Sequence, residues 1–270
     1  MDEKTIYKTW LNEWLRVYKR PSVSDKTYQN LRIIYRKHIP ERLKETAIGK
    51  LSALDIQKAL NAVEHSRTRL DVYNVFNGSL KVAFVLGLID RNPCELVIKP
   101  KHVRKLGEAL SAEELTKFLS DIRRHKLEPF FLFCLLTGCR RSEGLSLKWS
   151  DIDFDKNVIH IRGTKTLTSD RTLPLFPDCA ALLKRLDKGK SERVFPHRAS
   201  YVTHEFKKVC PAHKLHDLRH TFATRCLECG ISMKVVQIWL GHSRIETTAS
   251  VYTHVPDEFS RSESQKFKLT

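Results

Sequence analysis

Strict alternation of apolar and polar residues, the pattern of a β-strand, occurs in only one short region of this 270-residue chain. Residues 158–162 and 171–175 alternate in this way, and the eight residues between them are turn-like. Such a pair of segments predicts a β-hairpin. Elsewhere the apolar residues recur at the three- and four-residue spacing of amphipathic helices. We therefore expect a mainly α-helical protein with one small β-hairpin or sheet, an α+β fold.

The first part of the chain contains four helical patterns. A serine hydroxyl can accept a hydrogen bond from a free N–H group of a first helical turn, so Ser52 is a suitable starting point. Asp55 stands three residues after Ser52, in the capping-box position. The four segments are residues 6–17, with Ile6, Trp10, Trp14 and Val17 on one face, residues 24–38, a helix from Ser52, and residues 70–86, followed by Gly87.

A basic stretch separates this helical part from the rest of the chain. Residues 97–108 are rich in Lys and Arg and contain Pro100, and proline disfavours helix at the residue before it. We interpret the stretch as an extended linker between a helical domain of residues 1–96 and a second domain of residues 109–270, with a tail from about residue 256. Ser111, followed by Glu114, predicts the first helix of the second domain.

The charge of the chain indicates a polyanionic partner. The net charge is +17, with +9 on residues 1–104 and +8 on the remainder, and the pI is about 9.6. A pI above about 9 is typical of nucleic-acid-binding domains. An anionic lipid surface is the alternative, but the longest apolar run, Phe130 to Leu136, is far below the ~20 residues that span a bilayer. The N-terminus lacks the apolar segment of a secretory signal.

The seven cysteines are odd in number and scattered, which predicts no disulfide framework and a location in the reducing cytoplasm, at the nucleoid. His216 and His220 stand close to Cys226 and Cys229, which suggests a zinc site as an alternative. Structural zinc takes two separated pairs of ligands, whereas these four residues share one helical run. We therefore interpret the two cysteines as small core residues and expect neither a metal nor another cofactor.

Three segments of the second domain carry side chains suited to a phosphodiester. In the first, Arg140 precedes a predicted helix start at Ser142 and Glu143, where free backbone N–H groups can join a guanidinium in binding an anion. An arginine in such a position is by itself most often a surface residue.

The second segment places His216, Arg219 and His220 three and four residues apart, hence on one helical face. In the third, His242 follows a helix-end glycine, and Tyr252 comes ten residues later. Each segment alone has a structural explanation, but together they supply a clamp for phosphate and a nucleophile.

The order and the residue motifs of these segments resemble those of the tyrosine recombinases, also called the phage integrase family. The resemblance covers about residues 4–265 and is strongest over residues 137–153, 163–175 and 214–254. The family's pattern includes T-G-x-R-x-x-E, a hairpin lysine, H-x-L-R-H, L-G-H and a tyrosine before T-H. Six residues of this chain match it in order: Arg140, Lys165, His216, Arg219, His242 and Tyr252.

The resemblance implies a four-helix SAM-like domain that binds core DNA over residues 1–96 and a catalytic domain over residues 109–270. It implies a site-specific recombinase that cleaves and rejoins DNA, integrating or excising a phage or other mobile element. Tyr252 would attack the phosphodiester and form a 3′-phosphotyrosyl bond. Arg140 and Arg219 would clamp the phosphate oxygens, and His242 would add a third donor.

The remaining matches concern proton transfer. His216 would accept or relay the proton of the tyrosine, and Lys165 on the hairpin would protonate the leaving 5′-oxygen. Glu143 is interpreted as a buried partner that orients Arg140. Because the covalent intermediate conserves the bond energy, we expect no need for ATP, and no step calls for a metal.

The family resemblance also implies a homotetramer on paired double-stranded DNA sites, with the tail from about residue 256 packed on a neighbouring subunit and a DNA-bending protein as a possible accessory. The chain begins directly with the core-binding pattern, and whether an arm-binding module precedes it is left open. The alternatives are a type IB topoisomerase-like or telomere-resolving enzyme and a catalytically silent DNA-binding regulator. The complete set of six residues argues against the silent regulator.

Overall fold

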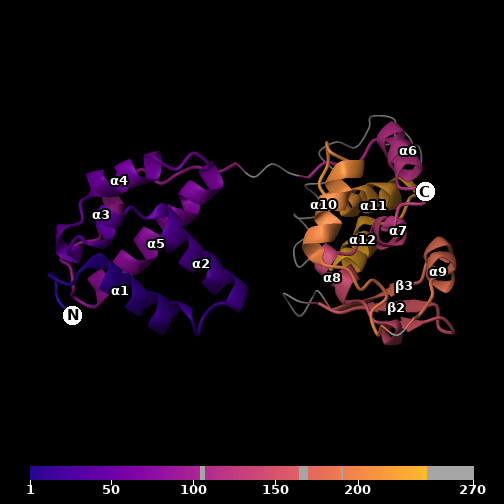
Figure 1. Ribbon diagram of the computed structural model, residues 1–270, viewed down its shortest axis with the longest axis horizontal. Helices are drawn as coiled ribbons and strands as arrows, with labels where there is room; N and C mark the ends of the chain where they lie inside the picture. Colours follow the sequence, from indigo (N-terminus) through magenta and orange to yellow (C-terminus); the bar gives the residue numbers. More distant parts are fainter. Residues whose placement is uncertain (104–106, 164–169, 190, 242–270) are drawn as a thin grey trace, which may run out of the picture. The chain divides into compact units, whose positions relative to one another are not determined.

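The computed structural model describes residues 1–103, 107–163, 170–189 and 191–241, and the chain forms two compact units, residues 1–104 and 105–270 (Figure 1). Each unit encloses an apolar core of its own. The described residues are mainly helical, and their one named sheet lies in the second unit. The expected fold class, mainly α with a small sheet, is therefore confirmed. No helix among the described residues has the length and apolar character needed to cross a membrane.

The first unit is helical throughout its described residues. The hydroxyl of Ser52 accepts a hydrogen bond from the N–H group of Asp55, as predicted, and the hydroxyl of Ser24 likewise accepts the N–H group of Thr27. The helices are α1 (Tyr7–Trp14), the π-helix η1 (Leu15–Lys19), α2 (Asp25–His38), α3 (Glu41–Lys44), the 3₁₀ helix η2 (Ile48–Lys50), α4 (Ala53–Asn61), α5 (Ser66–Val85) and the 3₁₀ helix η3 (Pro93–Leu96).

The apolar face predicted for the first helix is partly wrong. Trp10 and Trp14 are buried, but Ile6 and Val17 are 36% and 44% exposed. Val17 lies in the π-helix η1, which has more residues per turn than the α-helix on which the prediction was based. Each residue of a π-helix therefore turns the chain through a smaller angle, and Val17 does not return to the face that carries the two tryptophans.

The second unit combines helices with a small antiparallel sheet. The predicted hairpin is confirmed, with Ile161 opposite Arg171 and Val158 opposite Pro174. The elements are α6 (Ala112–Asp121), α7 (Glu128–Thr137), α8 (Arg141–Ser146), the 3₁₀ helix η4 (Trp149–Asp151), β1 (Ile152–Asp153), β2 (Val158–Ile161), β3 (Arg171–Pro174), α9 (Pro177–Lys184), α10 (Ala199–Val209), α11 (Asp217–Glu228) and α12 (Met233–Leu240).

Two details of this unit bear on the sequence predictions. The capping box at Ser111 is present, with the hydroxyl and the Glu114 carboxylate each accepting a backbone N–H. The strand β1, which pairs with β2, was not predicted, because two residues are too few to show an alternating pattern. The sheet therefore has three strands, in the order β1-β2-β3.

Helix α7 lies at the centre of the core of the second unit. Phe130, Phe131 and Phe133 are fully buried, and the helix packs against α9 and α11. A helix that is apolar on every side is stable only when its neighbours surround it. This packing brings the C-terminal end of α7 to the first turns of α11, where two of the predicted site residues stand.

All seven cysteines are free thiols, and six of them are buried. Burial raises the pKa of Cys94, Cys179 and Cys226 to about 12 in each case. The interpretation as a core residue is confirmed for Cys226 and wrong for Cys229, which is exposed. Helix α11 ends one residue before Cys229, so the helical spacing no longer directs that side chain inward.

Candidate active site

Three of the six predicted site residues, Arg140, His216 and Arg219, are described by the structure, and all three belong to the second unit. The other three, Lys165, His242 and Tyr252, lie outside the described residues. The charges of Arg140 and Arg219 act on one another and on His216. The fold therefore brings together side chains that are more than 70 residues apart in the sequence.

Arg219 is the most deeply buried of the three, with 2% of its surface exposed. It donates from Nη1 to the carbonyl oxygen of Gly138 at 2.8 Å and from Nη2 to that of Leu240 at 2.6 Å. These carbonyls belong to the C-terminal ends of α7 and α12, where helices carry partial negative charge. A single guanidinium thus fixes the ends of two helices relative to α11.

The surroundings of Arg219 are electrostatically unfavourable for a cation. Desolvation by burial, followed by the positive charges of Arg140 and Arg171, lowers the pKa of Arg219 to about 9. The guanidinium still carries its charge at neutral pH. An anion bound nearby would relieve both the repulsion and the loss of solvation, so the site favours an anionic ligand.

Gly138 makes this arrangement sterically possible. Its φ of 60° lies in the left-handed region, which glycine adopts at helix C-termini without steric cost. A Cβ atom on this residue would stand 2.4 Å from Cδ1 of Phe222 and 2.7 Å from Cδ2 of Leu240. The absence of a side chain lets the backbone approach α11 and α12 closely enough for its carbonyl to reach Arg219.

Arg140 is held by Glu143, as the sequence predicts. Its N–H donates to Glu143 Oε2 at 2.8 Å, and its Nη1 donates to Oε1 at 2.6 Å. Glu143 is 2% exposed, whereas 34% of the Arg140 side chain remains accessible. The carboxylate therefore fixes the guanidinium from the protein side and leaves its outer edge open to a ligand.

Glu143 has a second cationic partner, Arg171, whose Nη2 donates to Oε2 at 3.0 Å. Burial would raise the pKa of Glu143, but the hydrogen bond and charge of Arg171, together with Arg140, bring it below its usual value. The carboxylate is ionised at neutral pH. Its single negative charge faces three guanidinium groups among the described residues, Arg140, Arg171 and Arg219, which leaves an excess of positive charge.

His216 stands immediately before α11 and is exposed to solvent. Desolvation of its ring, followed by the positive charges of Arg219, His220 and Arg140, lowers its pKa to about 4. The ring is therefore neutral at neutral pH and can accept a proton. The rings of His216 and His220 lie 5.2 Å apart in an edge-on arrangement.

The end of the linker and the residues that follow it support the start of α11. A Cβ atom on Gly107 would lie 2.5 Å from Cδ2 of His220 and 2.7 Å from Oδ1 of Asp217, and the Leu110 N–H donates to Thr221 Oγ1 at 2.9 Å. Asp217, which the sequence left without a role, is buried and accepts the N–H of Lys214 at 2.8 Å. These contacts fix the helical turn on which His216 stands.

Arg171 is the residue that sequence reasoning missed. The alternating pattern assigned Arg171 only to a strand. Its side chain lies on the same face of that strand as the side chain of Leu173, which is buried. A charged residue in an inward-facing position of a strand is a signal that a buried partner exists. That partner, Glu143, belongs to a helix 28 residues earlier, so the sequence alone did not reveal it.

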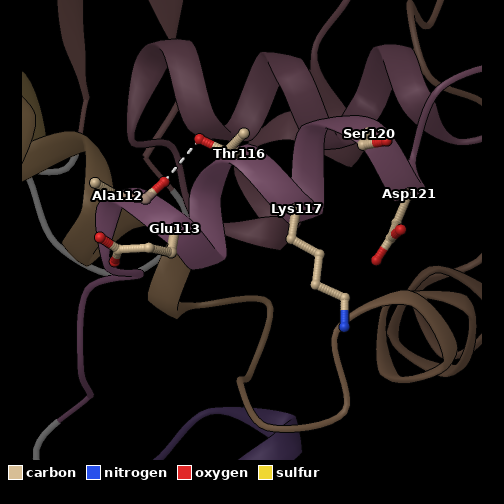
Figure 2. Close-up of a pocket in the computed structure, with 6 residues that line it drawn as sticks. All are labelled: Ala112, Glu113, Thr116, Lys117, Ser120 and Asp121. Atoms are coloured by element: carbon tan, nitrogen blue, oxygen red, sulfur yellow. Dashed lines mark hydrogen bonds between the residues drawn. The ribbon is translucent and has the colours of Figure 1, made fainter.

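No cluster of three or more His, Cys, Asp or Glu residues that could hold a metal is present within the described ranges. His216, His220, Cys226 and Cys229, the residues of the zinc alternative, are all described and do not form such a cluster. A shallow hollow runs along one face of α6 (Figure 2), and none of the candidate site residues lines it.

Comparison with known protein families covers both units. Residues 102–258 match the model of the phage integrase family, and residues 6–63 match the N-terminal SAM-like domain of phage integrases.

The individual proteins that this chain is similar to include tyrosine recombinases. The chain is 28% identical to a XerC-like tyrosine recombinase of Caldanaerobacter subterraneus, over 93% of this chain and 78% of the relative. It is also 28% identical to the tyrosine recombinase XerA of Pyrococcus furiosus, over 94% and 92% of the two chains.

Two solved structures share the fold. The integrase of transposon Tn1549, in complex with a circular intermediate DNA, superimposes with a TM-score of 0.74 at 20% identity, over 97% of this chain and 99% of that one. A lambda integrase dimer bound to a core site gives a TM-score of 0.80 at 18% identity, over 98% and 81%.

Proposed function

The chain belongs to the phage integrase family, and on this basis we propose that it is a site-specific DNA recombinase with Tyr252 as its nucleophile. The observation that carries the proposal is the cluster of Arg140, Arg171 and Arg219 beside the neutral His216. Among the described residues, these three positive charges outnumber the two buried carboxylates next to them, Glu143 and Asp217. A phosphodiester undergoing in-line attack develops charge on its equatorial oxygens, and forked guanidinium donors fit those oxygens.

The proposed reaction begins with attack of the Tyr252 hydroxyl on the scissile phosphorus. The P–O5′ bond breaks, the protein becomes joined to the 3′-phosphate, and a free 5′-hydroxyl is released. In this scheme Arg140 and Arg219 bind the non-bridging oxygens with His242, while the neutral imidazole of His216 takes up the tyrosine proton. The same steps in reverse rejoin a strand, so no ATP is consumed.

Lys165 is proposed to protonate the leaving 5′-oxygen. Side chains alone then bind the phosphate and transfer both protons, so the scheme needs no metal ion. DNA cleavage by this route would occur on the chromosome or an element within it, in the cytoplasm.

Double-stranded DNA is the proposed substrate, bound by both basic halves of the chain. Lambda integrase has been solved as a dimer on a core site and as a tetramer on a Holliday junction. We extend that assembly to this chain as a homotetramer on paired sites, to which a DNA-bending protein is a possible addition. The net positive charge on each half of the sequence supports a clamp that contacts phosphates from two sides.

Covalent trapping tests this proposal directly. A duplex nicked close to the cleavage site loses a short fragment after attack, which leaves the protein bound to DNA. The native chain should form this adduct, and Tyr252→Phe should form none while its DNA affinity is retained, because only the attacking oxygen is lost. Tyr201→Phe, a change at an exposed tyrosine of α10, is the matched control and should behave as the native chain does.

Two results would contradict the proposal. An adduct with Tyr252→Phe would show that another residue is the nucleophile, and no adduct with the native chain on its attachment site would indicate a silent DNA-binding protein. Exchange of strands between two sites in a plasmid assay, rather than relaxation alone, separates a recombinase from a topoisomerase-like enzyme.

A further inference from the structure

Arg171 occupies a position at which three parts of the second unit meet. It is the first residue of β3, and in the sequence it follows the segment 163–170 that contains Lys165. Only 4% of its side chain is exposed. Its Nη2 donates to Glu143 Oε2 at 3.0 Å, and its Nε donates to the carbonyl oxygen of Trp239. The side chain therefore joins the base of the hairpin to α8 and to α12.

The contact with α12 is made at the helix end. Trp239 and Leu240 are its last two residues, and their carbonyl oxygens accept hydrogen bonds from Arg171 and Arg219. Carbonyls in the last turn of a helix have no partner within the helix and carry its negative partial charge. Two buried cations on consecutive carbonyls therefore fix the C-terminal end of α12, the helix that precedes His242 and Tyr252 in the sequence.

The contact with Glu143 affects Arg140. Glu143 Oε2 accepts both the backbone N–H of Arg140 and the guanidinium of Arg171, while Oε1 accepts Nη1 of Arg140. Since Arg171 balances the buried carboxylate, Arg140 is oriented by Glu143 without being neutralised by it. Among the described residues, loss of Arg171 would leave Arg140 as the one arginine hydrogen-bonded to Glu143 and would draw it toward the protein interior.

We infer that Arg171 is a positioning residue of the active site, which sets Arg140, the hairpin base and the end of α12 in one geometry although it is too buried to touch DNA. The inference rests on the proposed function, since the geometry in question is that of the cleavage reaction. It predicts that a change at Arg171 reduces the rate of cleavage much more than the affinity for DNA.

The test is Arg171→Lys, which keeps the charge but replaces a fork of separate donors by a single nitrogen that cannot reach Glu143 and the Trp239 carbonyl in the same way. Cleavage of the nicked substrate should slow by about 100-fold, the cost of a displacement of about 1 Å in a catalytic geometry. DNA affinity should change by less than about 3-fold, since no contact to DNA is removed.

Arg162→Lys is the matched control. Arg162 lies next to β2 in the same hairpin and also pairs with a carboxylate, donating from Nε to Asp151 Oδ1 at 2.8 Å, but 55% of its side chain is exposed. This variant should cleave at nearly the native rate. An equal loss of cleavage in both variants would overturn the inference, because any weakened arginine pair of the hairpin would then suffice.

Hydrogen exchange without DNA separates this inference from the proposed function. Arg171→Lys should speed amide exchange by about tenfold at the end of α12, residues 236–241, and leave α10 unchanged, because only the anchor of α12 is weakened. Unchanged exchange at α12 would refute the anchoring role. Faster exchange with a normal cleavage rate would refute the link to catalysis. A native chain that forms no adduct would defeat the proposed function, while the exchange result would still decide whether Arg171 anchors α12.

Discussion

Substitution of Gly138 by alanine should strongly destabilise the second unit. The residue has a φ of 60°, and a left-handed conformation costs a residue with a Cβ about 1–2 kcal/mol. The new methyl group would also stand 2.4 Å from Phe222 Cδ1 and 2.7 Å from Leu240 Cδ2. Forcing such a group into a packed core costs about 1–3 kcal/mol. The two effects together amount to about 2–5 kcal/mol, a large part of the ~5–15 kcal/mol by which domains are stable.

Gly230→Ala separates the two contributions. Gly230 has a φ of 78°, and a Cβ atom there would meet nothing within 4 Å. Its substitution should therefore show the conformational cost alone, about 1–2 kcal/mol. The difference between the two variants, about 1–3 kcal/mol, measures the close approach of Gly138 to α11 and α12.

The assay is urea unfolding of the whole chain, followed by hydrogen exchange in peptides of α7 and α11 so that the first unit does not contribute. Gly138→Ala should also slow formation of the covalent DNA adduct, because the Gly138 carbonyl accepts a hydrogen bond from Arg219. Equal destabilisation by the two alanines would show that Phe222 and Leu240 yield without cost, and our account of this glycine would be wrong.

Three further predictions concern the proposed site. The pKa of His216 in the fold, about 4, is below its ordinary value of 6.5, so the unfolded chain binds more protons between these values and the free energy of unfolding should fall as the pH is lowered from 6.5 toward 4. His216→Asn should weaken this dependence, as urea titrations at several pH values would reveal. Arg140→Lys and Arg219→Lys keep the charge but lose the forked donors, and single-turnover cleavage should slow by about 100-fold or more in each, with smaller changes in DNA affinity measured by filter binding. Lys165→Ala should be slow on a normal substrate but nearly restored when sulfur replaces the 5′ bridging oxygen, since a thiolate of pKa about 8.5 leaves without the proton that an alkoxide needs; equal impairment on both substrates would make Lys165 a positioning contact only.

The parts of the fold that the sequence predicted are those determined by neighbours in the chain. Ser52 and Ser111 each cap a helix through N–H groups no more than three residues away. The pairing of Arg140 with Glu143 is equally local and was also predicted. Interactions of this kind depend on spacing alone, and spacing can be read directly from the sequence.

The errors and omissions arise where distant contacts or irregular backbone decide the outcome. Val17 is exposed because a π-helix changes the number of residues per turn, and no residue type in the sequence predicts that change. Arg171 owes its burial to Glu143 and to the end of α12, which only the folded chain brings together. The hydrogen-bond acceptors of Arg219 are the backbone carbonyls of Gly138 and Leu240. A pattern of residue types does not indicate which backbone carbonyls a distant side chain will contact.

The distribution of the thiols offers a practical advantage for following this protein in solution. Six cysteines are buried, and Cys229 alone is exposed, at the C-terminal end of the helix that carries Arg219. Since the thiolate is the reactive form, the raised pKa of Cys94, Cys179 and Cys226 further protects those residues. A maleimide dye should therefore label the native chain at a single site without any substitution, and its fluorescence would report the response of α11 to bound DNA.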